Sequence, residues 1–385
     1  MEYKKIGDLT NVITGGTPST AKFEYWDNGD IPWLQSGCCQ NCDVDFAEKY
    51  ITQEGYDNSS TRLMPKNTVM IALTGATAGK IGYLNFEACG NQSITGILPC
   101  ELLNQRYLFY FLLSQREKIL VDCIGGAQPH ISQGYVKNIQ VPMFSLEKQK
   151  EIVDTLSCLS GIINKRKEEI RCLDELIKAR FVEMFGDPVI NEKGWETKPL
   201  LDMGDCKNGM NFHYDDCGVE INCLGVGDFK NLSVIDNTGQ LPTVSLNEIP
   251  SEEYLLKDDD IVFVRSNGNK ALVGRSVAVY PGDVKTTFSG FCIRYRKHDD
   301  AVIIPYLLRA LKADSIRRKM AGRGANIQNL NQQILGTLLI PVPPIEIQNE
   351  FSDFIKQVDK SKFAVQKSLE ETQLLFDSLM QEYFG

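Results

Sequence analysis

Apolar residues recur at alternating spacings of four and three along residues 146–185 of this 385-residue chain. This spacing lines one face of an α-helix and favours packing against a partner helix with the same period. No glycine or proline falls within 162–185, and Gly186, Asp187 and Pro188 then end the pattern. About forty residues in one helix extend roughly 60 Å. The predicted seam comprises Ile152, Leu156, Leu159, Ile163, Arg166, Ile170, Leu173, Ile177, Arg180 and Met184.

The C-terminal residues repeat this seam at an offset of 199, which is the separation between Pro142 and Pro341 ahead of the two helices. The phase holds to the end of the chain, where Phe384 and Gly385 match Phe185 and Gly186. A match of this length indicates an internal duplication. The second seam comprises Phe351, Ile355, Val358, Lys362, Val365, Leu369, Thr372, Phe376, Leu379 and Tyr383.

A globular segment is predicted before each helix, giving domains at 1–144 and 187–343 and helices at 145–186 and 344–385. The length of the chain also suggests about two domains. Short apolar strands, Gly-containing turns and one amphipathic helix per segment predict an α+β fold.

The two globular segments present their elements in the same order. The apolar strand predicted at 69–73 corresponds to 260–265, and the Gly turn at 78–80 corresponds to 273–275. The helix predicted at 105–119 corresponds to one that begins at Pro305. The sequence pattern also pairs residues 92–96 with 287–291.

Connectivity predicts that the two helices pair in antiparallel fashion. A parallel pair would need residues 187–197 to return along about 60 Å, whereas eleven extended residues reach at most about 40 Å. The expected molecule is pseudo-twofold symmetric, with two similar globular domains joined by a pair of long antiparallel coiled-coil helices. Arg166 and Arg180 on one seam, and Lys362 and Thr372 on the other, are expected to fix the register.

Composition is typical of a globular protein, with 43% hydrophobic and 24% charged residues. No apolar run approaches the roughly 20 residues of a membrane span, and the first residues lack a secretory apolar region, so a cytoplasmic location is expected. Twelve scattered cysteines then favour free thiols. Cys38, Cys39 and Cys42 lack a second ligand pair, so no metal site is expected there.

Catalytic motifs are missing from the sequence. It contains no Walker A loop, dinucleotide-binding Gly loop, His-Glu-x-x-His or Gly-x-Ser-x-Gly motif. The three histidines, His130, His213 and His298, are far apart in the sequence. We therefore expect no active site and no cofactor on this chain.

The duplicated order resembles the specificity subunit of type I restriction–modification systems. The resemblance rests on residues 126–131, 139–142, Gln149 and Ile152, and in the second copy on 324–330, 339–344, Gln348 and Phe351. The chain departs from the family in lacking a Pro-Pro pair in the first copy. It also carries Lys148 and Ile347 where an acidic residue usually precedes the glutamine.

The resemblance implies that each globular domain is a target-recognition domain that reads one half of a bipartite, gapped target in double-stranded DNA. The helices would set the spacing and dock two methylation subunits that use S-adenosylmethionine, and motor-nuclease subunits could join. Half-site spacing in dimeric DNA-binding proteins is likewise set by geometry. The chain itself would be non-catalytic.

The net charge of −9 leaves a second interpretation open, a coiled-coil adaptor that binds only proteins, because DNA binding relies on Lys and Arg at the interface. The basic run at 317–319 is either a phosphate contact or a solvent-facing helix end. Asn, Gln, Arg and Lys are the side chains that read base edges. The candidate DNA-binding residues are Gln35, Lys80, Asn91, Gln92, Gln128 and His130 in the first domain, and Arg265, Asn267, Asn269, Lys270, Arg275, Arg323, Asn326 and Gln328 in the second.

Overall fold

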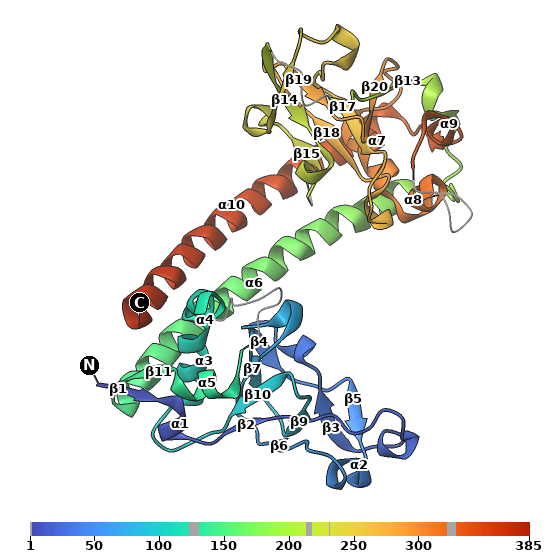
Figure 1. The fold of residues 1–385 in the computed structure, drawn as a ribbon. Helices are drawn as coiled ribbons and strands as arrows, with labels where there is room; N and C mark the ends of the chain where they lie inside the picture. Colours follow the sequence, from blue (N-terminus) through green and yellow to red (C-terminus); the bar gives the residue numbers. More distant parts are fainter. Residues whose placement is uncertain (1, 123–130, 213–217, 231, 322–328) are drawn as a thin grey trace. The chain divides into compact units, whose positions relative to one another are not determined.

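The computed structural model describes residues 2–122, 131–212, 218–230, 232–321 and 329–385. The chain forms two compact units, one of Met1–Glu168 with Gln366–Gly385 and the other of Glu169–Val365. Two helices of forty residues, α6 (Leu146–Phe185) and α10 (Ile345–Phe384), contribute one half to each unit (Figure 1). No helix within the described ranges is both long and apolar enough to cross a membrane.

Unit 1 begins with a strand that pairs with the strand leading into α6. Its strands are β1 (Glu2–Lys5), β2 (Val12–Thr14), β3 (Ile31–Leu34), β4 (Cys42–Val44), β5 (Lys49–Ile51), β6 (Leu63–Met64), β7 (Val69–Ala72), β8 (Ile81–Leu84), β9 (Ala88–Gly90), β10 (Ile94–Ile97) and β11 (Gln140–Met143). Its shorter helices are α1 (Ile6–Leu9), α2 (Gln53–Asp57), α3 (Gln105–Ser114), α4 (Arg116–Asp122) and α5 (Gln133–Asn138).

Unit 2 repeats this plan. Its strands are β12 (Thr197–Pro199), β13 (Gly204–Asn208), β14 (Val219–Leu224), β15 (Val234–Ile235), β16 (Thr243–Leu246), β17 (Asp260–Val264), β18 (Ser276–Val279), β19 (Thr286–Phe288), β20 (Cys292–Lys297) and β21 (Leu339–Pro341). Its shorter helices are α7 (Ile304–Lys312), α8 (Asp314–Ala321) and α9 (Gln332–Gly336).

The five-stranded sheets of the two units have equivalent topology, while the second sheet has four strands in unit 1 and three in unit 2. A five-stranded sheet has the order β2-β10-β7-β8-β4 in unit 1 and β13-β20-β17-β18-β15 in unit 2. In both, the edge strand β4 or β15 runs parallel to its neighbour, while the remaining pairs are antiparallel. A second sheet contains the parallel pair β3–β9 in unit 1 and β14–β19 in unit 2. This shared order confirms the predicted duplication and α+β class.

Hydrogen bonding corrects one detail of the predicted match. Asn91 donates its backbone N–H to Leu34, and Ser289 donates its own to Leu224, so residue 289 corresponds to residue 91 at an offset of 198. The pairing of 92–96 with 287–291 used an offset of 195 and was therefore wrong by three residues. Strands β9 and β19 have three residues each, Ala-Cys-Gly and Thr-Thr-Phe, which is too little shared pattern to align the two copies.

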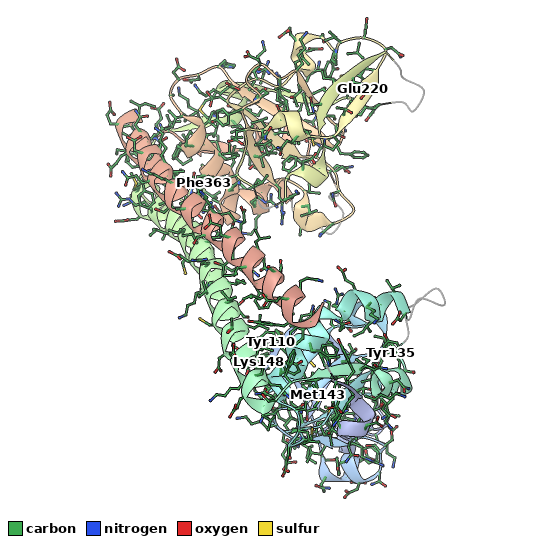
Figure 2. All side chains as sticks on the ribbon, turned by 90° about the vertical axis from the view of Figure 1, so that its left-hand side faces the viewer. Tyr110, Tyr135, Met143, Lys148, Glu220 and Phe363 are labelled. Atoms are coloured by element: carbon green, nitrogen blue, oxygen red, sulfur yellow. The ribbon has the colours of Figure 1, made fainter. Side chains whose placement is uncertain are left out.

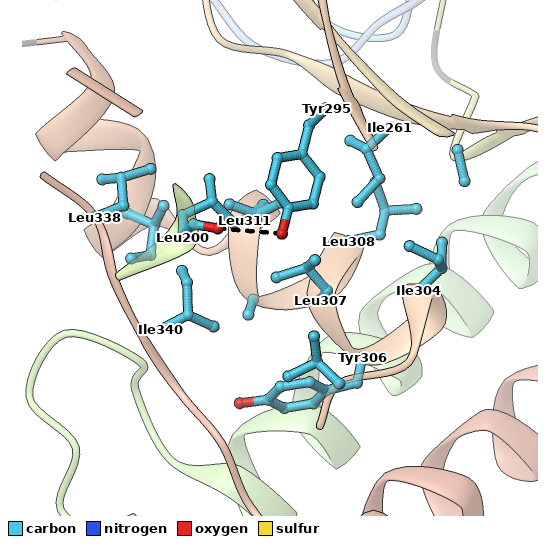
Figure 3. Packing of buried hydrophobic residues seen from close by; sticks show 14 of the residues in the cluster. Leu200, Ile261, Tyr295, Ile304, Tyr306, Leu307, Leu308, Leu311, Leu338 and Ile340 are labelled. Carbon is cyan, nitrogen blue, oxygen red and sulfur yellow. Dashed lines mark hydrogen bonds between the residues drawn. The ribbon is translucent and has the colours of Figure 1, made fainter. Parts of the chain in front are cut away.

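Strand β7 forms the centre of the unit 1 sheet, and all four of its residues are buried. The turn into β8 needs a left-handed residue, which Gly79 supplies at φ +73°, and Gly274 supplies it in unit 2 at φ +76°. The core of unit 2 packs α7 against the sheet, with Tyr306 and Leu307 fully buried (Figure 3). Tyr295 in this core donates its hydroxyl to the carbonyl of Leu200 at 3.2 Å (Figure 3).

The helix predicted at 105–119 is broken into α3 and α4. Gln115 sits between them at φ −86° and ψ 0°, and its side-chain amide donates to the carbonyl of Phe384 at 3.4 Å. Helix α3 begins at a side-chain cap, because the oxygen of Asn104 accepts from the backbone of Arg106 and Tyr107. The break lets α4 turn at the point where α3 meets the end of α10.

The halves of α6 and α10 pair in antiparallel fashion within each unit. In unit 1, Ile152 and Leu156 near the start of α6 pack in one cluster with Met380 and Phe384 near the end of α10. In unit 2 the end of α6 meets the start of α10, because the ring of Phe181 contacts that of Phe351 with centroids 5.6 Å apart. Aromatic and aliphatic contacts of this kind hold each helix pair on its own domain.

Every apolar seam position is buried or half-buried. Among the polar seam residues, Arg166 donates to the carbonyl of Ser368 and to the hydroxyl of Thr372. In unit 2, Lys362 pairs with Asp174 at 2.6 Å. The apolar seam residues are Ile152, Leu156, Leu159, Ile163, Ile170, Leu173, Ile177, Phe351, Ile355, Val358, Val365, Leu369 and Phe376.

Candidate nucleic-acid interface

Four loops of unit 1 meet at one end of its two larger sheets. Gly15 and Gly16 donate their backbone N–H groups to Ile94 and Gly90, which brings the loop after β2 beside the turn between β9 and β10. Asn41, in the loop after β3, donates its backbone N–H to Ile81 at the start of β8. The sheet end therefore gathers turns that are far apart in sequence.

The predicted residues of this domain lie on those loops. Gln35 is exposed at the end of β3, and the ammonium of Lys80 donates to the side-chain oxygen of Gln40 at 2.5 Å. Asn91 is half-buried and accepts from the backbone N–H of Ser93 at 3.1 Å, whereas Gln92 is exposed. All four are placed at the same end of the sheets.

Unit 2 builds the equivalent end from the loops around β14, β17, β18 and β19. Arg265 donates its backbone N–H to Phe291 at 2.8 Å, and its guanidinium donates to the carbonyl of Gly290 at 3.3 Å. Ser289 bonds to the end of β14 through the carbonyl of Leu224. The side chain of Arg265 therefore joins the loop after β17 to the loop between β19 and β20.

Four further unit 2 candidates, Asn267, Asn269, Lys270 and Arg275, lie in the β17–β18 connection. The side-chain oxygen of Asn267 accepts from the backbone N–H of Asn269, and that of Asn269 accepts from Ala271, at 2.8 and 3.1 Å. These two bonds fold the connection back on itself and use amide oxygens, so the NH2 groups are the ends left to donate. Arg275 points elsewhere, because its guanidinium donates to the carbonyl of Lys230 at 2.8 Å.

Six candidates lie partly or wholly outside the described residues. Their neighbours on the chain are placed, since Ile131 donates its backbone N–H to Leu73 and Leu330 donates to Arg265, both at the loop-bearing sheet end. The six comprise Gln128, His130, Arg323, Asn326 and Gln328, together with the side chain of Lys270.

The structure adds residues to this end that the sequence did not single out. Gln40 bonds Lys80, and the hydroxyl of Thr17 donates to the side-chain oxygen of Gln92. These bonds join residues 40 and 75 positions apart, so no local spacing signals them. The one local signal for the loop of Thr17 is its Gly-Gly-Thr-Pro sequence at 15–18, which is typical of a turn.

The cysteines near this end remain thiols in the structure. A hydrogen bond with Cys39 lowers the pKa of Cys38, and the same bond together with burial raises the pKa of Cys39. Burial raises the pKa of Cys42. Within the described ranges, no three His, Cys, Asp or Glu side chains are grouped in a way that would hold a metal ion.

Two α+β units of one topology, each with a polar loop end and half of a helix pair, define a duplicated recognition protein. The chain belongs to the type I restriction modification DNA specificity family, whose domain matches residues 1–171 and 192–373.

Two curated relatives illustrate the relationship. The specificity subunit of the MjaIX enzyme of Methanocaldococcus jannaschii is 30% identical over 230 residues, covering 54% of this chain and 53% of the relative. The EcoR124I/EcoR124II specificity subunit of Escherichia coli is 29% identical over 173 residues, covering 44% of this chain and 43% of the relative. The chain therefore spans about half the length of these relatives.

Among solved structures, the type I restriction–modification S subunit from M. genitalium is similar with a TM-score of 0.56. The alignment covers 100% of this chain and 96% of that one at 16% identity. At this low identity the similarity shows a shared fold and nothing further.

Proposed function

We propose that this chain is the non-catalytic DNA sequence-specificity subunit of a type I restriction–modification complex. Each globular domain reads one half of a bipartite, gapped target in double-stranded DNA. The first half-site is contacted through Gln35, Lys80, Asn91 and Gln92. The second is contacted through Arg265, Asn267, Asn269 and Arg275. Residues Gln128, His130, Lys270, Arg323, Asn326 and Gln328 complete the two sets.

The observation that carries this proposal is the recurrence of one loop-bearing sheet end in two units whose loops differ in sequence. Topology is retained while the side chains at this end change from Lys80 and Gln40 in unit 1 to Arg265 and Asn269 in unit 2. Arg and Lys suit guanine edges, and Asn and Gln suit adenine edges, so changed side chains imply unlike half-sites.

The helices supply the second part of the function. Since α6 and α10 are each continuous from one unit into the other, they set the separation of the half-sites and offer a surface for two methylation subunits. Large side chains remain exposed on both helices, including Leu176 at 47% and Phe363 at 72% (Figure 2). S-adenosylmethionine would be bound by the methylation subunits, and motor-nuclease subunits would join the same assembly.

Binding to DNA with one half-site scrambled tests the proposal. A target selected from random DNA with the full chain and its methylation subunits would be compared with two versions, each scrambled in one half. We expect both scrambled versions to bind more weakly than the intact target. Equal binding to all three would favour a protein-binding adaptor instead.

A further inference from the structure

A basic cavity lies within unit 2, bordered by the β17–β18 connection of the loop-bearing sheet end. Its volume is about 640 Å³. Four of the cations that line it are Arg275 immediately before β18, Arg309 and Lys312 on α7, and Arg317 on α8. We call these four residues the cation cluster.

The cation cluster is held by neutral acceptors. Lys312 donates to the hydroxyl of Ser233 at 2.7 Å, and Arg317 donates to the carbonyl of Ala271 at 3.1 Å. Arg275 donates to a backbone carbonyl as well, that of Lys230. Within the described ranges none of the four is within ion-pair distance of a carboxylate, and Asp174, Glu175 and Asp314 act on them only at longer range.

Three carboxylates also line the cavity, and two of them are engaged elsewhere. Asp174 pairs with Lys362, and Asp187 accepts from the backbone N–H groups after it in the chain. Asp314, in the first turn of α8, is the third. Lys178 and Lys230 line the cavity too, and Lys178 pairs with Glu175 at 2.5 Å. Six cations therefore face four carboxylates in all, and the balance remains positive.

Burial and neighbouring charges shift the pKa values of three members of the cation cluster. Burial, followed by the charge of Arg309, lowers the pKa of Lys312 to about 8. Burial also lowers the pKa of Arg309 and, with the neighbouring Arg275, that of Arg317. Cations crowded in a partly desolvated cavity are stabilised by an anion that enters it.

A buried hydroxyl adds a donor to the cavity wall. Ser276 lines the cavity next to Arg275 and is 3% exposed. Its Oγ has no hydrogen-bond partner in the part of the chain that the structure describes. A buried hydroxyl without a partner is costly, and an anion in the cavity would accept its hydrogen bond.

The duplication shows that the fold does not require these charges. Tyr107 and Tyr306 each donate the hydroxyl to a proline carbonyl at 2.8 Å, that of Pro142 and that of Pro341. Both donors and both acceptors are 199 positions apart, so α7 aligns with α3 at this offset. At this offset Arg309 corresponds to Tyr110 and Lys312 to Leu113. Tyr110 packs beside α6 in unit 1, where its hydroxyl lies 3.1 Å from that of Ser157 (Figure 2).

We propose that this cavity of unit 2 is an anion site that binds a phosphate group, supplied by the backbone of the DNA strand at the second half-site. The proposal rests on the proposed function for the source of the phosphate. Arg309, Lys312 and Arg317 then hold the DNA in place without reading its bases, as phosphate contacts do. Arg275 and Ser276 complete the donor set.

The test uses the full chain and the Lys312→Leu variant, which installs the side chain found in unit 1. Inorganic phosphate should raise the thermal unfolding temperature of the wild type at constant ionic strength and leave that of Lys312→Leu unchanged. Binding of the variant to target DNA should weaken equally on all second half-site sequences. The slope of log K against log salt should fall by about 0.9 for each DNA phosphate that the variant no longer neutralises.

Lys356→Leu is the matched control, since Lys356 is an exposed lysine of unit 2 that does not line the cavity. It should behave as the wild type in both assays. Phosphate protection that is the same in wild type and Lys312→Leu overturns the anion site. Abolished protection with an unchanged salt slope overturns the DNA source and leaves a small-anion site, whereas a wild type that binds no DNA refutes the proposed function separately.

Discussion

Gln149 and Gln348, 199 positions apart, make equivalent hydrogen bonds at the starts of α6 and α10. The side-chain oxygen of Gln149 accepts from the backbone N–H of Asn104 at 2.8 Å, and that of Gln348 accepts from Ile303 at 3.0 Å. Asn104 and Ile303 are the residues before α3 and α7. Both glutamines are fully buried, so each fixes a long helix to the first turn of its domain helix.

Removing either amide should destabilise the corresponding unit. In Gln348→Leu, the backbone N–H of Ile303 and the carbonyl of Pro343 would lose their partners while buried. Leaving a buried polar group unsatisfied costs about 1–3 kcal/mol. Urea unfolding should show this loss for Gln348→Leu, and Gln357→Leu on the exposed side of α10 should unfold as the wild type does.

Arg265→Ala should weaken recognition of the second half-site alone. Removing a good base contact costs about 1–3 kcal/mol, and the first half-site is read by another unit. The measurement is binding to targets that carry every single-base change in each half. Discrimination should relax at one or two positions of the second half only.

Lys80→Ala is the mirror control for that experiment. It should relax discrimination in the first half-site and leave the second intact. If either variant bound all sequences more weakly by the same factor, the residue would be a phosphate contact rather than a base reader.

Lys312 makes stability depend on pH in the alkaline range. Its pKa is about 8 in the folded chain against an ordinary 10.5, so between these values the unfolded chain binds more protons. Stability in that window therefore rises with pH, by at most about 1.4 kcal/mol per unit. The charged groups that act on Lys312 are Arg309, Asp174, Lys362 and Arg317.

Lys312→Leu should remove this dependence. The variant should be more stable than the wild type below pH 8, and the difference should shrink as the pH rises towards 10.5. Denaturant unfolding of both proteins at several pH values measures it, with ordinary tyrosine and cysteine titration common to both. A constant difference across the range would show that Lys312 titrates normally.

Phe351→Ala should lower the free energy of unfolding by weakening the packing of α10 against the core of unit 2. Phe351 is fully buried, and its ring centroid lies 5.4 Å from that of Phe185 and 5.6 Å from that of Phe181. Truncating a buried phenylalanine costs about 3–5 kcal/mol. Phe363→Ala on the same helix removes a ring that is 72% exposed and should change the unfolding free energy little (Figure 2).

The sequence was most informative where one periodic pattern persisted over many residues. The alternating spacing of Ile152 and Leu156 in α6, repeated by Phe351 in α10, was sufficient to predict both long helices and the duplication. Short elements were less predictable, because β9 and β19 have too few residues for the sequence to fix how the two copies align. The break at Gln115 was not predicted either, and it recurs in unit 2 at Ala313, between α7 and α8.

The candidate-site residues that follow local turns were predictable from sequence, whereas those brought together by packing were not. Gly turns predicted that Lys80 and Arg275 follow equivalent tight turns, and Gly79 and Gly274 adopt matching left-handed conformations. The cation cluster was not predicted as a group, because Arg275 and Arg309 become neighbours only through packing of α7 beneath the β17–β18 connection. Of its members, the sequence marked Arg275 as a base reader and Arg317 as part of a basic run.

Selection from randomised double-stranded DNA would show whether this chain reads two separate sequences at a fixed spacing, as we propose. The full chain, co-expressed with its methylation subunits, would be used to enrich bound fragments. We expect two short specified blocks of different sequence, separated by a constant number of unspecified base pairs. A single contiguous block, a variable gap, or no enriched sequence would contradict the proposal.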